Sequence, residues 1–331
     1  MSDDANTETL ELAGAVLDRD RRALAKAITL VESTRSDHRL QAEVLMETLL
    51  PHSGQAVRLG VTGTPGVGKS TFINRFGTQL LADGLRLAVL AVDPSSRTTG
   101  GSILGDKTRM PDLAGHGDVF VRPSPSGGIS GGVALRTRDA LVVCEAAGFD
   151  TVIVETVGVG QSETAVAGLT DLFLLLVAPG GGDDLQGIKR GVLELADVVA
   201  INKADGELVD LARRTAADYQ SALRLVRPKR PELPTSVVTC SALTGDGLGD
   251  LRTLLWRIHR RLSESGALVR LRSQQAVEQL ETEVRSLLYH RSSRNDRFRR
   301  LQAELQTDVA EGRISVSAAA RRLADAALPP S

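Results

Sequence analysis

The segment Gly63–Thr71, GTPGVGKST, has the residue types and the spacing of a phosphate-binding loop. Its glycines allow backbone N–H groups to surround a β-phosphate, and Lys69 is placed to reach the β- and γ-phosphates. Ser70 can offer its hydroxyl to Mg²⁺. A strand-like run precedes the segment and a helix-like run follows it, as this motif requires. The residues expected to bind a nucleoside triphosphate are Gly63, Thr64, Pro65, Gly66, Val67, Gly68, Lys69, Ser70 and Thr71.

A second group of polar residues follows two later strand-like runs and has the pattern that reads guanine. The carboxylate of Asp205, in the N-K-x-D sequence NKAD, can accept both the ring N–H and the exocyclic amine of guanine. Adenine would leave that carboxylate unpaired, which is costly in a buried site. Asp205 could instead only cap a helix, but the order of the motifs favours GTP or GDP. The expected base-binding residues are Asn202, Lys203, Asp205, Ser241, Ala242 and Leu243, the last three through backbone N–H groups.

The strand-like run TVIVE ends in Glu155, and Gly158 follows at the spacing of a D-x-x-G motif, in which most GTPases have aspartate. Glu155 has one more methylene than aspartate, so its carboxylate can reach further toward Mg²⁺-bound water. The Gly158 amide can meet the γ-phosphate. Gln161 stands later than the glutamine that orients water in many small GTPases. We therefore expect slow hydrolysis that a partner accelerates by about 10³- to 10⁵-fold.

These motifs need a sheet to position them, and the hydrophobic pattern supplies one. Short apolar runs alternate with longer amphipathic segments between Val57 and His259. This alternation predicts an α/β fold, a P-loop NTPase with a mostly parallel central sheet flanked by helices. Helical periodicity outside this region predicts N-terminal and C-terminal helical extensions. The expected parts are a helical segment at 1–55, a GTPase domain at 56–262 and a C-terminal helical segment at 263–331.

Composition excludes several other classes of function. A formal net charge of -1 and 3% aromatic residues give little support for nucleic-acid binding. The apolar stretch 172–178 is too short to span a bilayer, so we expect no membrane partner. Cys144 and Cys240 are far apart and form no metal-type pair, which is typical of packing residues in a reducing compartment. We expect a cytoplasmic protein.

Six motifs in their order resemble the MeaB/ArgK family of GTPases, which includes the human methylmalonic aciduria type A protein. They are GTPGVGKST, DPSSRTTGGSILGDKTRM, VRPSPSGGISGG, VIVETVGVGQSE, PGGGDDLQGIKRG and NKAD. The resemblance runs from about Val57 to Ala242, and the flanking helical segments agree in length and character. In that family glutamate replaces the usual aspartate, as it does at Glu155.

The chemistry of the acidic residues predicts a metal site, and the resemblance implies an additional switch and a partner. Asp93 and Asp106 would supply acidic groups across the Mg²⁺ from Glu155, with Ser70 as a further ligand. Alternatively, Asp93 only caps the turn at Pro94, and Asp106 only pairs with Lys107 or Arg109. The segment 178–191 would be a switch loop in which Gln186 and Lys189 fall on matching positions, although Lys189 could be simply solvated. Family members are G-protein chaperones that gate adenosylcobalamin delivery to acyl-CoA mutases and guard these enzymes from inactivation.

The helix-like segment after Ser265 presents one apolar face, made by Val277, Leu280, Val284, Leu287 and Leu288. A sheet domain flanked by its own helices offers nothing obvious to cover this face, so we expect it to form a homodimer, as in the resembled family. The alternative is that the helix folds back on its own domain. The arginine-rich run Arg291–Arg300 is expected to be a solvated loop between helices, and we assign it no site.

Three other functions are compatible with parts of the pattern. A nickel metallochaperone GTPase also has N-K-x-D and a phosphate loop, but such proteins carry histidine tracts or a cysteine pair. The five histidines of this chain are scattered: His38, His52, His116, His259 and His290. A kinase linked to amino-acid transport would use ATP, which conflicts with Asp205. A nucleotide-dependent scaffold without catalysis also fits the motifs.

Overall fold

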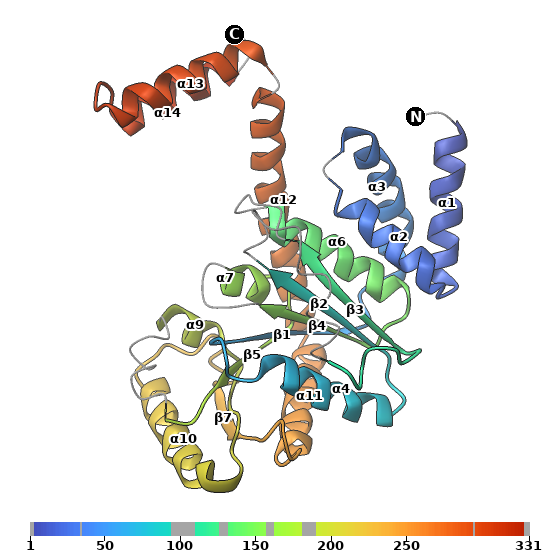
Figure 1. Ribbon diagram of the computed structural model, residues 1–331, viewed down its shortest axis with the longest axis vertical. Helices are drawn as coiled ribbons and strands as arrows, with labels where there is room; N and C mark the ends of the chain where they lie inside the picture. The colour runs from blue at the N-terminus through green and yellow to red at the C-terminus, as the bar shows by residue number, and fades with distance from the viewer. Residues whose placement is uncertain are drawn as a thin grey trace. The chain divides into compact units, whose positions relative to one another are not determined.

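The centre of the chain is a parallel sheet of seven described strands in the order β3-β2-β4-β1-β5-β6-β7 (Figure 1). The computed structural model describes residues 3–33, 35–93, 110–125, 132–156, 162–180, 190–293 and 295–327. The strands are β1 (Val57–Gly63), β2 (Leu87–Asp93), β3 (Val119–Pro125), β4 (Thr151–Thr156), β5 (Leu172–Val177), β6 (Val198–Ile201) and β7 (Ser236–Thr239). All neighbouring strands run parallel, which confirms the predicted α/β fold.

Helices cover both faces of this sheet, and the side chains of β5 pack against helices on both faces. Leu172, Leu174 and Leu176 pack with α4 (Lys69–Ala82) and α11 (Leu248–Glu264). Phe173 belongs to the cluster that contains α6 (Gly132–Ala146) and α7 (Ser162–Ala167). Leu175 and Val177 join a third cluster with α9 (Arg190–Leu195) and α10 (Val209–Leu223). Burial on both faces explains why these strands are continuously apolar rather than alternating.

Three N-terminal helices pack beside α6. They are α1 (Asp3–Leu17), α2 (Arg21–Val31) and α3 (Ser36–Leu49), followed by the short 3₁₀ helix η1 (Leu50–His52). The side chain of Asp20 caps α2 by accepting a hydrogen bond from the Ala23 N–H. The buried residues of these helices share one hydrophobic cluster with α6. Both cysteines are buried and free, as expected of packing residues.

The chain divides into two compact units, Met1–Gln275 and Ala276–Ser331. The boundary falls inside α12 (Ala267–Ser293), and the expected boundaries after residues 55 and 262 stay predictions. The second unit also contains α13 (Asp296–Ala310) and α14 (Val316–Ala327), with Phe298, Leu305 and Ala319 buried. The expectation of a loop at Arg291–Arg300 is wrong, because α12 continues to Ser293 and α13 begins at Asp296. Among the described helices, none is long and apolar enough to cross a membrane.

A buried ion pair holds the first turns of α12 to the amino end of β5. The Arg272 guanidinium donates to both carboxylate oxygens of Asp171, at 2.8 Å from Nε and 2.6 Å from Nη2. The backbone N–H of Arg58 donates to the same carboxylate, and Arg272 also donates to the carbonyls of Gly54 and Ala56. The Asp171 side chain is fully buried. Arg272 therefore joins α12 both to the amino end of β5 and to the segment before β1, the strand that leads to the phosphate loop.

We expect Asp171→Asn to lower the free energy of unfolding by about 3–5 kcal/mol, the range found when one partner of a buried ion pair is removed. The cause is that Arg272 would stay charged and lose its anion. Asp210→Asn is the control, because Asp210 and its partner Arg213 are mostly exposed. That variant should change stability by no more than about 1 kcal/mol. Denaturant titration at pH 7 measures both, and equal losses would contradict the structural role of Asp171.

The pKa of Asp171 predicts how this stabilisation depends on pH. Burial alone would raise the pKa, but the hydrogen bonds from Arg272, together with the nearby His259 ring, outweigh it and lower the pKa to about 2, from an ordinary value of 3.8. A carboxyl whose pKa is lower in the folded state stabilises the fold at pH values above its unfolded pKa. The contribution should therefore be complete above about pH 4 and disappear as the pH falls toward 2. Titrations of Asp171→Asn across this range should lack that component.

Candidate functional site

The predicted nucleotide-binding motifs lie along one edge of the sheet. The phosphate loop follows β1, Glu155 stands near the end of β4, and the two guanine motifs follow β6 and β7. Because the strands are parallel, their carboxyl ends share one edge, where open α/β sheets bind ligands. β1 is central, with β4 on one side and β5 on the other. The phosphate loop is therefore flanked by β4, which carries Glu155, and by β5, and the two guanine motifs follow the next strands beyond β5.

Two glycines of the phosphate loop have conformations and surroundings that a side chain would disturb. Gly63 has φ +153°, and a Cβ there would come within 2.5 Å of the Leu176 carbonyl oxygen. Gly68 is the residue that precedes α4, has φ +93°, and would place a Cβ 3.0 Å from Asn202 Nδ2. Both are left-handed backbone positions that glycine adopts at little cost. The loop is thus shaped by close approach to β5 and to Asn202.

Lys69, the first residue of α4, is buried and faces the inside of the loop. Its Nζ donates to the carbonyl oxygens of Gly63 at 2.7 Å and Thr64 at 3.2 Å. Burial lowers the pKa of Lys69, and the negative charges of Glu155 and Glu163 oppose that shift. The ammonium therefore lies where the loop carbonyls and two carboxylates favour its charge, which is the place a phosphate-binding lysine needs.

Ser70 and Glu155 are brought together by the pairing of β1 with β4. In this register Val61 stands opposite Glu155. The Ser70 hydroxyl lies 3.4 Å from Glu155 Oε1, and Glu155 is only 5% exposed. The next residue, Thr156, shares a buried hydroxyl hydrogen bond of 2.7 Å with Thr62. A hydroxyl and a carboxylate so placed are oxygen ligands of the kind that Mg²⁺ prefers, so these two residues fit the predicted metal site.

Several predicted residues lie outside what the structure describes. Asp106, Gly158 and Lys189 fall in undescribed segments, as does Gln161. Asp93 ends β2, beside β4, but only its backbone is described. The backbone of Asp93 lies at the same edge of the sheet, in agreement with the expected site. The roles of Asp93 and of the residues in the undescribed segments stay predictions.

Asn202 is the central contact between the phosphate loop and the base-recognition motifs. Its side chain is buried; Nδ2 donates to the Val67 carbonyl at 2.9 Å, and Oδ1 accepts from the Ala242 N–H at 2.9 Å. Lys203, which has a left-handed backbone with φ 61°, donates from Nζ to the Gly66 carbonyl at 2.8 Å. Asn202 and Lys203, the two residues that follow β6, thus both donate hydrogen bonds to the phosphate loop.

Asp205 is oriented by Ser241, as its proposed contact with guanine requires. The Ser241 hydroxyl donates to Asp205 Oδ1 at 2.6 Å and accepts from the Thr244 N–H at 3.1 Å. Asp205 does precede the 3₁₀ helix η2 (Gly206–Leu208), but its side chain makes no capping hydrogen bond. The Ala242 N–H donates to Asn202, so a guanine oxygen at that amide would compete with Asn202. Leu243 has an exposed side chain at the end of the same turn.

One buried carboxylate near this site was not anticipated. Glu163, in the first turn of α7, is 1% exposed, and its charge acts on Lys69. The sequence does contain a signal, because Glu163 shares a helical face with Val166 and Ala167, which are both buried. An acidic residue on an apolar helix face marks a buried carboxylate.

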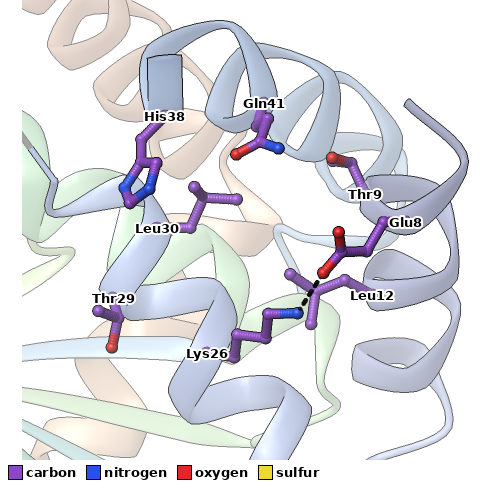
Figure 2. A pocket seen from close by; sticks show the side chains of 8 residues that line it. All are labelled: Glu8, Thr9, Leu12, Lys26, Thr29, Leu30, His38 and Gln41. Carbon is purple, nitrogen blue, oxygen red and sulfur yellow. Dashed lines mark hydrogen bonds and ion pairs between the residues drawn. The ribbon is translucent and has the colours of Figure 1, made fainter. Parts of the chain in front are cut away.

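A separate hollow of about 430 Å³ lies among α1, α2 and α3 (Figure 2). The Lys26–Glu8 ion pair, with 2.7 Å between Nζ and Oε1, joins α2 to α1 beside it. His38 lies across the hollow from this pair, and Leu12 and Leu30 give it apolar surface. No predicted nucleotide-binding residue lines the hollow. It is therefore not part of the candidate site.

Comparison with known proteins agrees with this geometry. The family model described as methylmalonyl-CoA mutase-associated GTPase MeaB matches residues 24–297. GTPase ArgK of Escherichia coli strain K12 is 46% identical over 309 residues, which cover 92% of each protein. A mouse protein, methylmalonic aciduria type A homolog, mitochondrial, is 47% identical over 265 residues, or 77% of this chain and 64% of that protein. The crystal structure of LAO/AO transport system kinase matches with TM-score 0.76 and 37% identity, covering 98% of both chains.

We expect Asp205→Ala to weaken GTP binding by about 10²- to 10⁴-fold, because two hydrogen bonds to a charged group contribute about 1.5–3 kcal/mol each. Asp205→Asn should shift the preference toward xanthine nucleotides, since an amide can donate to the extra oxygen of xanthine. Asp246→Asn is a control, because Asp246 is a neighbouring carboxylate that bonds Thr244 rather than Ser241. Calorimetry with GTP, XTP and ATP measures these preferences. ATP binding as tight as GTP binding by the unchanged protein would contradict the assignment.

Proposed function

The chain belongs to the MeaB family of methylmalonyl-CoA mutase-associated GTPases, and from this premise we propose that it is a G-protein chaperone for an acyl-CoA mutase. In this proposal GTP hydrolysis gates the loading of adenosylcobalamin into a mutase of the methylmalonyl-CoA type and protects the loaded enzyme. The observation that carries it is the family match across the same residues that build the nucleotide site. The chain is a GTP hydrolase with a P-loop fold, as its relatives' names and its structure agree.

Different residues of the site have different roles in GTP hydrolysis. Water attacks the γ-phosphorus, the bond to the β–γ bridging oxygen breaks, and GDP and inorganic phosphate form. Backbone N–H groups of the phosphate loop and the Lys69 ammonium stabilise the charge on the phosphate oxygens. Asp205 holds the base, and Asn202 keeps the base-binding turn at a set distance from the loop.

Ser70 and Glu155 are the described residues that would hold Mg²⁺, with Asp93 and Asp106 as further proposed carboxylates. When bound, Mg²⁺ would neutralise charge on the β- and γ-phosphate oxygens. Glu155 also lies within electrostatic range of Lys69, so it contributes to the charge balance of the site without the metal. Binding of Mg²⁺·GDP to Glu155→Ala, compared with GDP alone, measures the metal contribution separately from catalysis.

We propose that the basal rate is slow and that the mutase raises it. The sequence has no glutamine directly after Gly158, where many small GTPases orient the attacking water, and Gln161 stands later. A partner that orders the site can raise the rate by about 10³- to 10⁵-fold. Turnover of GTP with and without the cognate mutase tests this proposal. A fast basal rate that the mutase leaves unchanged would contradict it, and no turnover in either case would favour a nucleotide-dependent scaffold.

Lys189 is proposed to act in the stimulated reaction more than in nucleotide binding. It lies in the segment 178–191, which leads from the nucleotide edge at the end of β5 toward α9. We expect Lys189→Ala to keep GTP affinity within about threefold and to lose at least about tenfold of the mutase-stimulated rate. Lys26→Ala is the control, because it removes a lysine with an exposed side chain. Lys229→Ala would not serve, because Lys229 pairs with the buried Asp197. A loss of GTP affinity alone would instead make Lys189 an ordinary phosphate ligand.

We also propose a cytoplasmic homodimer formed through the second unit. Val277, Leu280, Val284 and Leu288 are exposed along α12. Leu287, which the pattern also placed on this face, is half-buried. A continuous apolar stripe of this kind is typical of a helix that packs against a second copy.

Leu280→Asp combined with Val284→Asp should convert the dimer to a monomer, because two carboxylates would be buried at an apolar contact. Light scattering at micromolar concentration, with and without GTP, measures the mass. Ala303→Asp, which places a carboxylate on an exposed position of α13, is the control and should stay dimeric. An unchanged protein that is monomeric under both conditions would contradict the proposal.

A further inference from the structure

A second hollow, of about 450 Å³, lies between α9, the end of α10 and the start of β7. Leu193, Leu223, Val226 and Val237 line its apolar part, and Arg224 and Arg227 stand at its margin. Its residues adjoin the amino ends of β6 and β7, whereas the nucleotide motifs follow the carboxyl ends. The hollow, hereafter the α9–β7 hollow, is therefore distinct from the candidate nucleotide site. Figure 1 shows α9 and α10 toward the end of the sheet where β7 lies.

The floor of the α9–β7 hollow is formed by residues at the partly exposed edge of the third hydrophobic cluster. Leu193 is only 6% exposed and belongs to that cluster with residues of β5, β6 and α10. Leu223, Val226 and Val237 are partly buried and pack against it. β7 is an edge strand, and all four of its residues are half-buried. An apolar side chain placed in the hollow would extend an existing core rather than contact an isolated patch.

The margin of the hollow carries exposed positive charge. Arg224 and Arg227 are exposed, while the next two cations along the chain, Lys229 and Arg230, bind the buried carboxylate of Asp197. One acidic residue, Glu194, also lines the hollow. The adjacent Leu225 is 84% exposed. Two exposed guanidinium groups beside an apolar floor match an acidic segment with an apolar side chain.

The loop that forms one wall is held in place before any partner binds. Lys229 Nζ lies 3.1 Å from Asp197 Oδ2, and Arg230 donates both to Asp197 and to the Asp171 carbonyl. Thr235 donates to the Ala196 carbonyl at 2.8 Å. Pro228 and Pro234, which line the hollow, restrict the same stretch of backbone. A preformed wall loses little conformational entropy on binding, which favours its use as a docking surface.

We propose that the α9–β7 hollow docks an acidic segment of a partner protein, which inserts one large apolar side chain and pairs carboxylates with Arg224 and Arg227. The inference rests on the proposed function, so the partner is the acyl-CoA mutase. An exposed apolar residue beside basic side chains is also a feature of surfaces that bind anionic lipid. The two arginines, the hollowed apolar floor and the fixed wall fit a protein segment better, because a lipid surface needs a protruding rather than a hollowed contact.

The test measures binding of the full-length protein to the purified, adenosylcobalamin-loaded mutase of the same organism. Arg224→Glu combined with Arg227→Glu should weaken binding by about tenfold or more, because both charge pairs become repulsive. Arg213→Glu combined with Arg214→Glu makes the same charge change on exposed residues of α10 and should stay within about twofold. Val226→Ser should weaken binding through the apolar floor. Basal GTP turnover and melting temperature of each variant confirm that the fold is retained.

The outcomes separate this inference from the function on which it rests. Weaker binding by the hollow variants alone, together with affinity that falls as salt rises from about 0.05 to about 0.3 M, would support it. Mutase binding that is equal in the unchanged protein and in both hollow variants would overturn the docking site and leave the proposed function standing. A mutase that the unchanged protein does not bind would overturn both. Binding of phosphatidylserine vesicles that the arginine substitutions abolish, with mutase binding intact, would assign the hollow to a lipid surface instead.

Discussion

The hydrogen bonds of the Asn202 side chain set the distance between phosphate binding and base recognition. Its amide donates to the phosphate loop at Val67 and accepts from the turn at Ala242, and it is buried. A buried amide that makes both bonds has a fixed position, because losing either would leave a polar group unsatisfied. Gly68 shows the same constraint from the other side, since a Cβ there would press on Asn202. In the proposed site the nucleotide would span the phosphate loop and this turn, so the Asn202 side chain would set the distance between its two binding motifs.

The charges around Lys69 explain how a buried cation is tolerated before and after phosphate binding. Burial lowers its pKa, while the carboxylates of Glu155 and Glu163 favour the charged form. Loop carbonyls at Gly63 and Thr64 accept hydrogen bonds from the ammonium. A bound triphosphate would bring more negative charge to the same place. The buried carboxylates of Glu155 and Glu163 would repel that charge unless a cation lay between them. The negative charge of Glu155 is therefore consistent with the proposed Mg²⁺ site, which would supply a positive counter-charge to the bound triphosphate.

The sequence was enough to predict the local motifs and the fold class, and its limits were in long-range contacts. Gly63–Thr71 and the N-K-x-D residues could be read because each is a short segment whose backbone geometry follows from its own residues. The parallel order placed Glu155 beside Ser70, as the motif order predicted. Asp171 and Arg272 are 101 residues apart, and no local pattern links an aspartate before β5 to an arginine in α12. The periodicity of the sequence placed both Leu287 and Leu288 on the apolar face of α12, but it could not say which of the two is more exposed.

The third hydrophobic cluster is the structural element common to the guanine motif, the predicted switch segment and the α9–β7 hollow. Val177 and Ile201, the last residues of β5 and β6, lie in this cluster and directly precede the switch segment and Asn202. Leu193 belongs to the same cluster and forms the floor of the hollow. A partner that docks there and prefers one arrangement of α9 would also favour one arrangement of the segment before it. By thermodynamic reciprocity, a partner that changed the affinity for the nucleotide would have its own affinity changed by the nucleotide by the same factor.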